Sequence, residues 1–343
     1  MDTLLLSDER FLLHDPGPGH PENPERLRAV HADLRRRPLA GVRSAQPRRA
    51  SAPELRRVHT QEHLLRIAAT AGRGSAILDP DTATSADSYE VALLAAGAAV
   101  QGAEEVVAGR AAGAFALVRP PGHHAEADAA MGFCLFNNVA VAAAHAAAEL
   151  GCRRVLVLDP DVHHGNGTQR SFYERRDVLF VSSHRFPFYP GTGWFDETGA
   201  GAGLGYSVNL PMPPRLGDAD FLHLYREVVG PVVEEHQPDL ILVSAGFDTW
   251  QHDPLGGMRM TERGYAAMFS LFRSWADRFC PGRIACALEG GYDPAGLSAG
   301  VRAALEALAG RNAELEGAPC AEALEIARRA RVGLAPFWKS LRG

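Results

Sequence analysis

The stretch RRVLVLDPDVHHGNGTQ, residues 153–169, begins as an apolar run and ends in polar side chains of types that bind metals. Its aliphatic part, 153–159, is typical of a strand buried on both faces of a parallel sheet. Asp161 and His163 are two positions apart, so on an extended segment they point the same way and can meet one cation. By itself a D-x-H pair is weak evidence for a metal, because Asp and His at a strand end can also cap the following helix.

Three further apolar runs resemble this strand, at 177–184, 238–248 and 283–291. Helical patterns separate the runs, and this alternation predicts an α/β protein with a central, mainly parallel sheet and helices on both faces. The stretch 185–217, with Gly and Pro throughout, is expected to be a long functional loop. The expected helices cover 88–110, 137–150, 218–236, 261–279 and 294–309.

Local signals predict where two of these elements, and a further helix near the N-terminus, begin or end. Asn137 or Asn138 is a natural N-cap for the alanine-rich helix that follows. Asn23 is expected to cap an N-terminal helix, with Pro24 at its first helical position. Pro160 has no N–H, so the preceding strand must lose a sheet hydrogen bond or end there.

Polar and reactive residues follow each of the expected strands. In an open parallel sheet ligands bind beyond the carboxyl ends of the strands, so these residues are expected to converge in space. Asp248 ends a second strand, and with Asp161, His163 and a water it would complete a catalytic zinc site with one open position. The remaining residues at the strand ends are Asp159, Ser182, His184, Glu289 and Tyr292.

Two adjacent histidines, His123 and His124, follow a rigid PPG turn and are expected to lie on a loop. Asp159 precedes a candidate metal ligand by two residues, which favours an orienting role over direct ligation. Such a carboxylate can accept a hydrogen bond from a histidine and fix the tautomer of that ring. The two histidines are therefore expected to lie near the candidate metal site.

The composition is that of an ordinary globular protein, with 343 residues, 46% of them hydrophobic and 22% charged. The length suits one large α/β domain or two average ones. A net charge of −6 argues against a nucleic-acid partner. Five scattered cysteines without a C-x-x-C pair indicate neither a disulfide framework nor a zinc finger, and favour a reducing compartment. The N-terminus lacks a signal-peptide pattern and no long apolar stretch is free of charge, so a cytoplasmic protein without a membrane partner is expected.

The chain resembles the histone deacetylase family, the metal-dependent deacetylases that include acetylpolyamine amidohydrolases, and its HHGNGTQ and DPLGG segments resemble the class II branch and bacterial relatives. The resemblance implies the arginase-deacetylase fold and one deacetylase domain over 1–343, with a core at roughly 14–310 and a C-terminal helical tail at 311–343. The matching motifs, in the family's order, are HPENPERL (20–27), RPPGHHAEADAAMGFCLFNN (119–138), LDPDVHHGNGTQ (158–169), YPGTG (189–193), SAGFDTWQHDPLGG (244–257) and LEGGYD (288–293).

The resemblance also implies a catalytic role for each matching position. Asp161, His163 and Asp248 would hold one zinc ion. The two adjacent histidines would flank the zinc-bound water, and a tyrosine hydroxyl would point at the substrate carbonyl. The positions with these roles are His123, oriented by Asp159; His124, supported by Asn166; and Tyr292.

Substrate and potassium positions follow from the same resemblance. Phe133 and Tyr189 would line a narrow channel for the acylated side chain, and Gly132 would accept a hydrogen bond from its amide. Asp81 would hold the substrate backbone at the rim, where Leu255 also lies. Plain core packing is the alternative for the two aromatic residues. One structural potassium ion would match Asp159, Asp161, His163, Ser182 and the backbone of Ser183, and Phe172 matches part of a second site.

The two histidines have unequal expected partners, which favours different roles for them. Asp159 carries a charge that can stabilise an imidazolium, whereas Asn166 carries none. Environments that shift the pKa values of two titratable groups in opposite directions suggest that one group is an acid and the other a base. Our hypothesis is that His124 stays neutral and acts as the general base, while His123 holds more positive character.

Several alternatives remain at this point. A dinuclear manganese hydrolase of the arginase type shares the fold, but needs carboxylates at the positions of Gly165 and Trp250, so a single metal is favoured. Polyamine-specific relatives keep an acid at the position of Leu255, and leucine favours acylated lysine in peptides or proteins as the substrate. An acetylpolyamine or other small acyl-amine amidohydrolase is the alternative, and a non-catalytic acyl-lysine binding protein is a third. A homo-oligomer is left open.

Some polar residues are expected to have structural roles only. These are the histidines His14, His20, His145 and His184, and a loop ion pair between Glu22 and Arg26. Trp250 is expected to shape the channel rim.

Overall fold

The structure is a computed structural model that describes residues 1–342, and its centre is an eight-stranded sheet in which all neighbouring strands are parallel. The strand order is β2-β1-β5-β10-β9-β6-β7-β8. This confirms the predicted α/β class with a mainly parallel sheet. The strands are β1 (Thr3–Leu6), β2 (Val42–Ala45), β5 (Ala114–Ala116), β6 (Val155–Asp159), β7 (Val178–Arg185), β8 (Ser207–Met212), β9 (Leu240–Ala245) and β10 (Ile284–Leu288).

The four expected strands are β6, β7, β9 and β10, and they lie side by side in the sheet. β6 ends at Asp159, immediately before Pro160, as the missing N–H of proline requires. The stretch 185–217, however, is not a loop throughout, because it contains β8 and a short 3₁₀ turn, η2 (Gly201–Gly203). β8 contains Pro211, which a strand tolerates at the edge of a sheet, where β8 lies.

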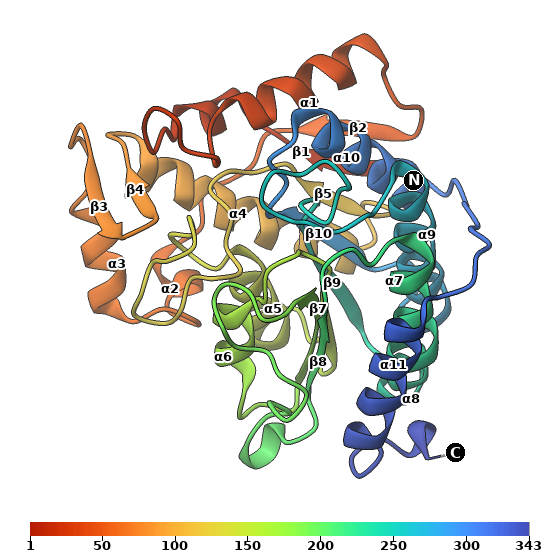
Figure 1. Ribbon diagram of the computed structural model, residues 1–343. Coiled ribbons are helices and arrows are strands. Elements are labelled where there is room, and N and C mark those ends of the chain that lie inside the picture. The colour runs from red at the N-terminus through yellow and green to blue at the C-terminus, as the bar shows by residue number, and fades with distance from the viewer. Residues whose placement is uncertain (343) are drawn as a thin grey trace.

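Helices cover both faces of the sheet, as predicted (Figure 1). α4, α5 and α6 lie on one side, and α1, α7, α9, α10 and α11 lie on the other. The helices are α1 (Glu25–Arg36), α2 (Ala52–Leu55), α3 (Gln61–Ala68), α4 (Ser88–Val107), α5 (Asn138–Glu149), α6 (Asn166–Phe172), α7 (Asp218–Leu224), α8 (Gly230–His236), α9 (Glu262–Phe279), α10 (Pro294–Leu308) and α11 (Ala321–Leu334). Shorter elements are η1 (Glu9–Leu13), η3 (Tyr225–Val229), η4 (Lys339–Leu341) and the antiparallel hairpin of β3 (Ala76–Asp79) and β4 (Thr82–Thr84).

The helix-end signals are confirmed in one case and shifted in another. Asn137 is the N-cap of α5, and its side chain accepts a hydrogen bond from the N–H of Ala140 at 2.9 Å. α1 begins at Glu25, one residue later than expected, and Pro24 takes the N-cap position. Asn23 still contributes, because its side-chain oxygen accepts from the N–H of Glu25 at 2.9 Å.

The helix expected over 218–236 is interrupted by a π-helical turn, η3, between α7 and α8. Pro231 follows this turn and has no N–H to offer the carbonyl of Glu227. Arg331 of α11 donates to that carbonyl instead, at 2.7 Å. The C-terminal helix therefore satisfies a backbone group of the domain, and it also packs against α7 and β8.

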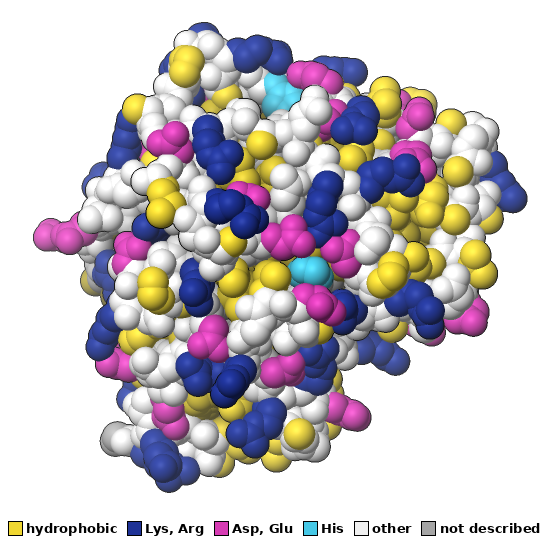
Figure 2. All heavy atoms as spheres, turned by 180° about the vertical axis from the view of Figure 1, so that it is seen from behind, with side chains coloured by type: hydrophobic (Ala, Val, Ile, Leu, Met, Phe, Trp, Pro, Cys, Tyr) yellow, Lys and Arg dark blue, Asp and Glu magenta, His cyan; other side chains and the backbone are white. Residues whose placement is uncertain are grey.

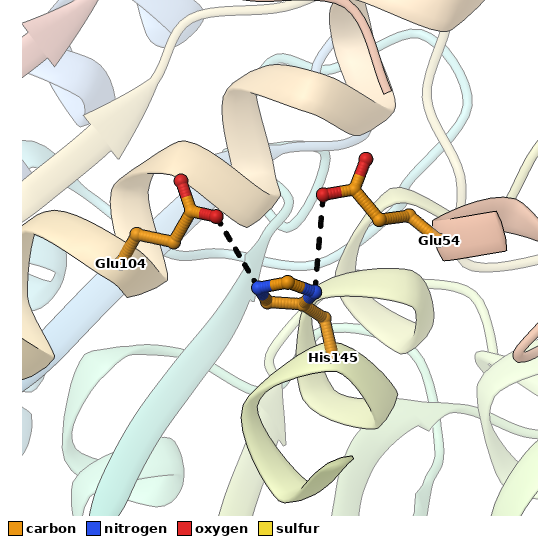
Figure 3. Close-up of side chains that lie close together, drawn as sticks. All are labelled: Glu54, Glu104 and His145. Carbon is orange, nitrogen blue, oxygen red and sulfur yellow. Dashed lines mark ion pairs between the residues drawn. The ribbon is translucent and has the colours of Figure 1, made fainter. Parts of the chain in front are cut away.

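His145 is a structural residue at the junction of three helices, as expected (Figure 3). Its ring lies between Glu104 of α4, 3.2 Å from Nε2, and Glu54 of α2, 3.8 Å from Nδ1. Arg48 bridges the same two carboxylates at 2.6 and 2.8 Å. Because the two acids face opposite ring nitrogens and already share a guanidinium, this cluster is an ion-pair network that ties the helices together rather than a metal site.

The surface carries both signs of charge. On the face shown in Figure 2, Lys and Arg side chains are interspersed with Asp and Glu side chains. Within residues 1–342, no helix combines the length and the apolar character that crossing a membrane requires.

Candidate active site

Three side chains from the ends of β6 and β9 meet at the carboxyl edge of the sheet. Nδ1 of His163 lies 3.1 Å from Oδ1 of Asp161 and 3.1 Å from Oδ2 of Asp248. Each of the three residues offers one possible ligand atom, these atoms lie within 4.8 Å of one another, and both carboxylates are fully buried. Residues that are up to 87 positions apart in the sequence therefore converge on one small volume.

Backbone groups hold the outer oxygens of the two acids. Gly290 donates its N–H to Oδ2 of Asp161 at 2.9 Å, and Val162 donates to Oδ1 of Asp248 at 2.8 Å. A Cβ at Gly290 would lie 2.2 Å from Asp248, and one at Gly246 would lie 2.1 Å from Asp161. Glycine is thus required at both positions for the chain to pass this close to the carboxylates.

The three groups perturb one another strongly. Burial alone would lower the pKa of His163, but Asp161 and Asp248 outweigh it and raise the pKa to about 9. Burial and the charge of Asp161 raise the pKa of Asp248 to about 7. Two buried acids around one imidazole nitrogen leave an excess of negative charge that a divalent cation would neutralise. One imidazole nitrogen and two carboxylate oxygens are donors that divalent metals such as zinc accept.

The two adjacent histidines have different hydrogen-bond partners. Nδ1 of His123 lies 3.0 Å from Oδ2 of Asp159, and Nδ1 of His124 lies 2.8 Å from Oδ1 of Asn166. Burial would lower the pKa of His123, but the charges of Asp159 and Asp161 raise it well above its usual value. Burial and the neighbouring histidines hold the pKa of His124 well below its usual value. The pKa values of the two imidazoles are therefore shifted in opposite directions, which the hypothesis of different roles requires.

Glu289 holds the loop that carries the histidine pair, a role that the sequence did not reveal. Its Oε2 accepts from the N–H of Gly122 at 2.6 Å and from the N–H of His123 at 3.1 Å. Burial raises the pKa of Glu289 to about 7. The position of Glu289 at the end of β10, beside the other strand ends, was the one signal that could have indicated this contact.

A pocket of about 370 Å³ opens above the three clustered residues. It is lined largely by the residues that the sequence singled out for catalysis and substrate binding. Phe188 was missed, although it directly precedes Tyr189; its ring stacks on His163 with centroids 5.2 Å apart. The lining residues are Asp81, Pro121, His123, His124, Gly132, Phe133, His163, Phe188, Tyr189, Pro254, Leu255, Gly290 and Tyr292.

One wall of the pocket is a strained segment held by the β3–β4 hairpin. Gly132 and Phe133 have φ values of +56° and +70°, which is unfavourable for phenylalanine. Asp81 accepts from the N–H of Gly132 at 3.1 Å, and Thr82 accepts from that of Phe133 at 3.0 Å. A Cβ at position 132 would lie 2.3 Å from the ring of His124, so a glycine is needed there.

A buried ion-pair network lies beneath Tyr292, which corrects the expectation of a loop ion pair. Glu22 and Arg119 are completely buried, and Arg26 is 2% exposed. Glu22 accepts from Arg26 at 2.9 Å and from Arg119 at 2.5 Å. Arg26 also donates to the carbonyl of Gly291 at 2.7 Å, and its guanidinium carbon lies 4.9 Å from the Tyr292 ring centroid. The network therefore supports the backbone on which the pocket tyrosine sits.

Replacing Glu22 with glutamine is expected to lower the free energy of unfolding by about 3 kcal/mol, since it leaves two buried guanidinium groups without their counter-charge. Burial would raise the pKa of Glu22, but Arg119 and the other network cations hold it well below its usual value, so the carboxylate is charged. Urea denaturation measures the change. Glu25→Gln, on an exposed part of α1, is the matched control, and an unchanged midpoint for Glu22→Gln would contradict the interpretation.

The positions matched to potassium lie around the same strand ends. Asp159 of β6 pairs in register with Ser182 of β7, and the hydroxyl of Ser182 lies 2.9 Å from Nδ1 of His184. Ser183 follows in β7, and Phe172 is buried at the end of α6. Trp250, by contrast, does not line the pocket: a Cβ at Gly296 of α10 would lie 2.4 Å from its ring, so it packs under that helix.

The parallel sheet, with acids and histidines gathered at its carboxyl edge, has the arginase-deacetylase fold, as expected. The Histone deacetylase domain family matches residues 20–308, and the chain belongs to the histone deacetylase family. It is therefore a hydrolase of that family.

Relatives and one solved structure agree with this placement. A probable deacetylase of Archaeoglobus fulgidus is 39% identical, with 86% of this chain and 83% of that protein covered. Histone deacetylase 15 of Arabidopsis thaliana is 42% identical, with 92% of this chain and 58% of that protein covered. A Pseudomonas aeruginosa protein named histone deacetylase-like amidohydrolase is 38% identical over 90% of this chain and 86% of its own length. The crystal structure of the HDA15 HD domain matches with a TM-score of 0.94 at 38% identity, covering 99% of this chain and 96% of that one.

Proposed function

We propose that the protein is a zinc-dependent deacetylase that hydrolyses the amide of acetylated, or otherwise acylated, lysine side chains in peptides or proteins. The observation that carries the proposal is the cluster of Asp161, His163 and Asp248 beneath a pocket that also exposes two differently partnered histidines and Tyr292. Each group has a role in amide hydrolysis, and the roles require the groups to face one small volume. Residues 311–343, which include α11, are proposed to complete the same domain.

The residues present fit one zinc ion held by Asp161, His163 and Asp248. A second metal of the arginase type would need a carboxylate at position 165, where a Cβ would lie 2.2 Å from Asp159. Trp250 occupies the other position that such a metal would need. When bound, zinc supplies Lewis-acid activation of the amide carbonyl and of water. We propose potassium as a structural ion near Asp159 and Ser182.

The proton transfers are assigned to the histidine pair. His124 is neutral, because burial and the positive charge of His123 oppose its protonation and its partner Asn166 is an uncharged amide, and it takes the proton from the attacking water. His123, beside Asp159, carries positive character and stabilises negative charge as the tetrahedral intermediate forms. The amine that leaves then receives the proton that His124 holds. The hydroxyl of Tyr292 donates a hydrogen bond to the oxyanion.

The shape of the pocket favours a linear acylated side chain. Phe133 and Tyr189 line the pocket together with the two histidines. Their rings would exclude water from the aliphatic part of the substrate side chain. Gly132 is proposed to accept the substrate amide N–H through its carbonyl. Asp81 is proposed to hold the substrate backbone, with the oxygen that does not bind Gly132 available for this contact. Leu255 adds an apolar surface to the rim.

Turnover of a fluorogenic acetyl-lysine peptide, with and without a chelator, tests the proposal directly. We expect turnover that is lost when the metal is removed and that returns when zinc is added back. Activity that survives complete removal of the metal would contradict the proposed mechanism. A fully zinc-loaded protein that hydrolyses no acylated amine would instead support a non-catalytic binding protein.

A small acyl-amine, such as an acetylpolyamine, is the second candidate substrate. Two observations favour it: the similar Pseudomonas protein is named an amidohydrolase, and Asp81 places a carboxylate on the pocket wall where a second ammonium could bind. Leu255 offers no such charge, which is why acyl-lysine remains the first choice. A side-by-side panel of acetyl-lysine peptides, acetylpolyamines and longer acyl chains separates the two by kcat/KM.

Tyr292→Phe is expected to lower kcat about 100-fold while leaving KM nearly unchanged, because one oxyanion donor is lost and the aromatic wall is kept. Steady-state kinetics with the same peptide measures both constants. Tyr173→Phe, outside the pocket, is the control and should match the parent protein. A rise in KM at constant kcat would show that Tyr292 serves binding rather than the chemical step.

A further inference from the structure

Asn166, the partner of His124, is itself held from behind by Glu126. The Nδ2 of Asn166 donates to Oε1 of Glu126 at 3.0 Å and to the carbonyl of His124 at 3.4 Å. On its other side, Oδ1 of Asn166 lies 2.8 Å from Nδ1 of His124. The three side chains therefore form a chain of hydrogen bonds that leads away from the pocket.

Because its oxygen and nitrogen occupy almost the same space, the orientation of the Asn166 amide depends on its hydrogen-bond partners, which also include Sδ of Met131 at 3.5 Å from Nδ2. A glutamate carboxylate only accepts hydrogen bonds, so Glu126 binds the NH₂ side of the amide. The amide oxygen must then face Nδ1 of His124. An amide turned over by 180° would set its oxygen against the carboxylate, and the repulsion excludes that orientation.

The amide orientation fixes the tautomer of His124. An oxygen facing Nδ1 requires the ring proton on Nδ1, which leaves the lone pair on Nε2. The reversed amide would donate to Nδ1 and move the ring proton to Nε2, where His124 could accept no proton from water. The carboxylate of Glu126, at 3.0 Å the nearest of the acceptors that face the amide NH₂, thus favours the orientation in which the ring can act as a base.

We propose that Glu126 is a positioning residue that sets the Asn166 amide and, through it, the base-competent tautomer of His124. The proposal deepens the proposed function and rests on it for the effect on turnover. The backbone of Glu126 is anchored on both sides, since its N–H donates to the carbonyl of Ala129 at 2.9 Å and its own carbonyl lies 2.9 Å from Nδ1 of His59. This anchoring holds the carboxylate in place behind Asn166.

The surroundings of Glu126 should allow its replacement without unfolding the protein. Its side chain is 19% exposed and, with Asn166, borders an open cavity of about 670 Å³. The other carboxylate oxygen lies 3.4 Å from Nε of Arg170, a residue that is 73% exposed. Replacing Glu126 therefore leaves a solvated space rather than a void in the core, and the variants are expected to fold.

The test compares Glu126→Met, which removes the acceptor at similar volume, with Glu126→Gln, whose side-chain oxygen can still accept from Asn166. Arg170→Met is the matched control, since it removes the ion-pair partner and keeps the bond to Asn166. We expect Glu126→Met to lower kcat about tenfold at unchanged KM, a typical effect for an outer partner of this kind. Glu126→Gln should recover most of the loss, and Arg170→Met should match the parent.

Nitrogen NMR of the zinc-loaded protein, labelled with ¹⁵N-histidine, reads the tautomer directly. The signals of His124 are identified by their absence in His124→Ala. We expect Nδ1–H in the parent, in Arg170→Met and in Glu126→Gln, and a mixture of tautomers in Glu126→Met. An unchanged tautomer in Glu126→Met overturns the proposal, whatever its turnover. If the parent hydrolyses no acylated amine, the proposed function fails, but the tautomer comparison still decides the role of Glu126.

Discussion

Asp248→Asn is expected to lower kcat/KM for an acetyl-lysine peptide by at least about 10³-fold, or about 4 kcal/mol in the activation barrier, and to reduce the bound divalent metal. The substitution keeps an oxygen that can accept from the N–H of Val162, at 2.8 Å in the native protein. The remaining amide nitrogen takes the place of the carboxylate oxygen that faces His163 at 3.1 Å. One of three ligands and one negative charge are therefore lost without a change of volume.

The stability of the metal-free variant separates this effect from misfolding. Burial and the charge of Asp161 raise the pKa of Asp248 to about 7, so an ionised Asp248 destabilises the native protein when no metal is bound. The asparagine variant should consequently melt, without metal, at the same temperature as the parent or above it. Asp277→Asn, on an exposed part of α9, is the control for the substitution itself. Full metal content together with normal turnover in Asp248→Asn would contradict the proposal that Asp248 is a metal ligand.

The sequence was most informative where one strand, β6, supplied both the fold and the chemistry. The apolar run before Asp159 is long enough to be recognised as a strand, and the polar residues after it mark the carboxyl edge of the sheet. β1, β2 and β5 were missed because they have only three or four residues, too short for a periodic pattern to appear, and β8 was missed because it lies in the Gly- and Pro-containing stretch that was expected to be a loop. The place of β1 and β5 in the sheet depends on pairing with strands far away in the chain, which local propensity does not encode.

Residues that act through their side-chain chemistry could be predicted, whereas residues that act through the backbone of others could not. Glu289 binds two N–H groups more than 160 positions away, and Arg119 donates to the backbone carbonyls of Phe11 and His14, which are 108 and 105 positions away. Thr82 supports the strained Phe133 in the same way. A single sequence gives no sign of such pairings, because each depends on the packed structure. The motif resemblance supplied the roles, and the structure supplies the contacts that make those roles geometrically feasible.

The second large effect is expected for the two adjacent histidines, whose replacement should lower kcat by different amounts. His124→Ala is expected to lower kcat about 10³-fold, since the general base is lost, whereas His123→Ala should lower it only about 10- to 100-fold. The physical reason is the difference between their partners: Asn166 leaves His124 neutral, and Asp159 keeps positive character on His123. Single-turnover kinetics of both variants, at equal metal content, measures the chemical step without interference from product release.

The two substitutions serve as controls for each other, because each removes a ring of the same size from adjacent positions with exposures of 3% and 4%. A general change in packing would therefore affect both variants alike. Exogenous imidazole adds a further distinction: a small base that enters the vacated space should partly restore His124→Ala and leave His123→Ala unchanged. If His123→Ala were the inactive variant and His124→Ala retained turnover, the charged ring beside Asp159 would be the group that moves the proton. The assignment of base and electrostatic partner would then be reversed, while the metal cluster and Tyr292 would keep their proposed roles.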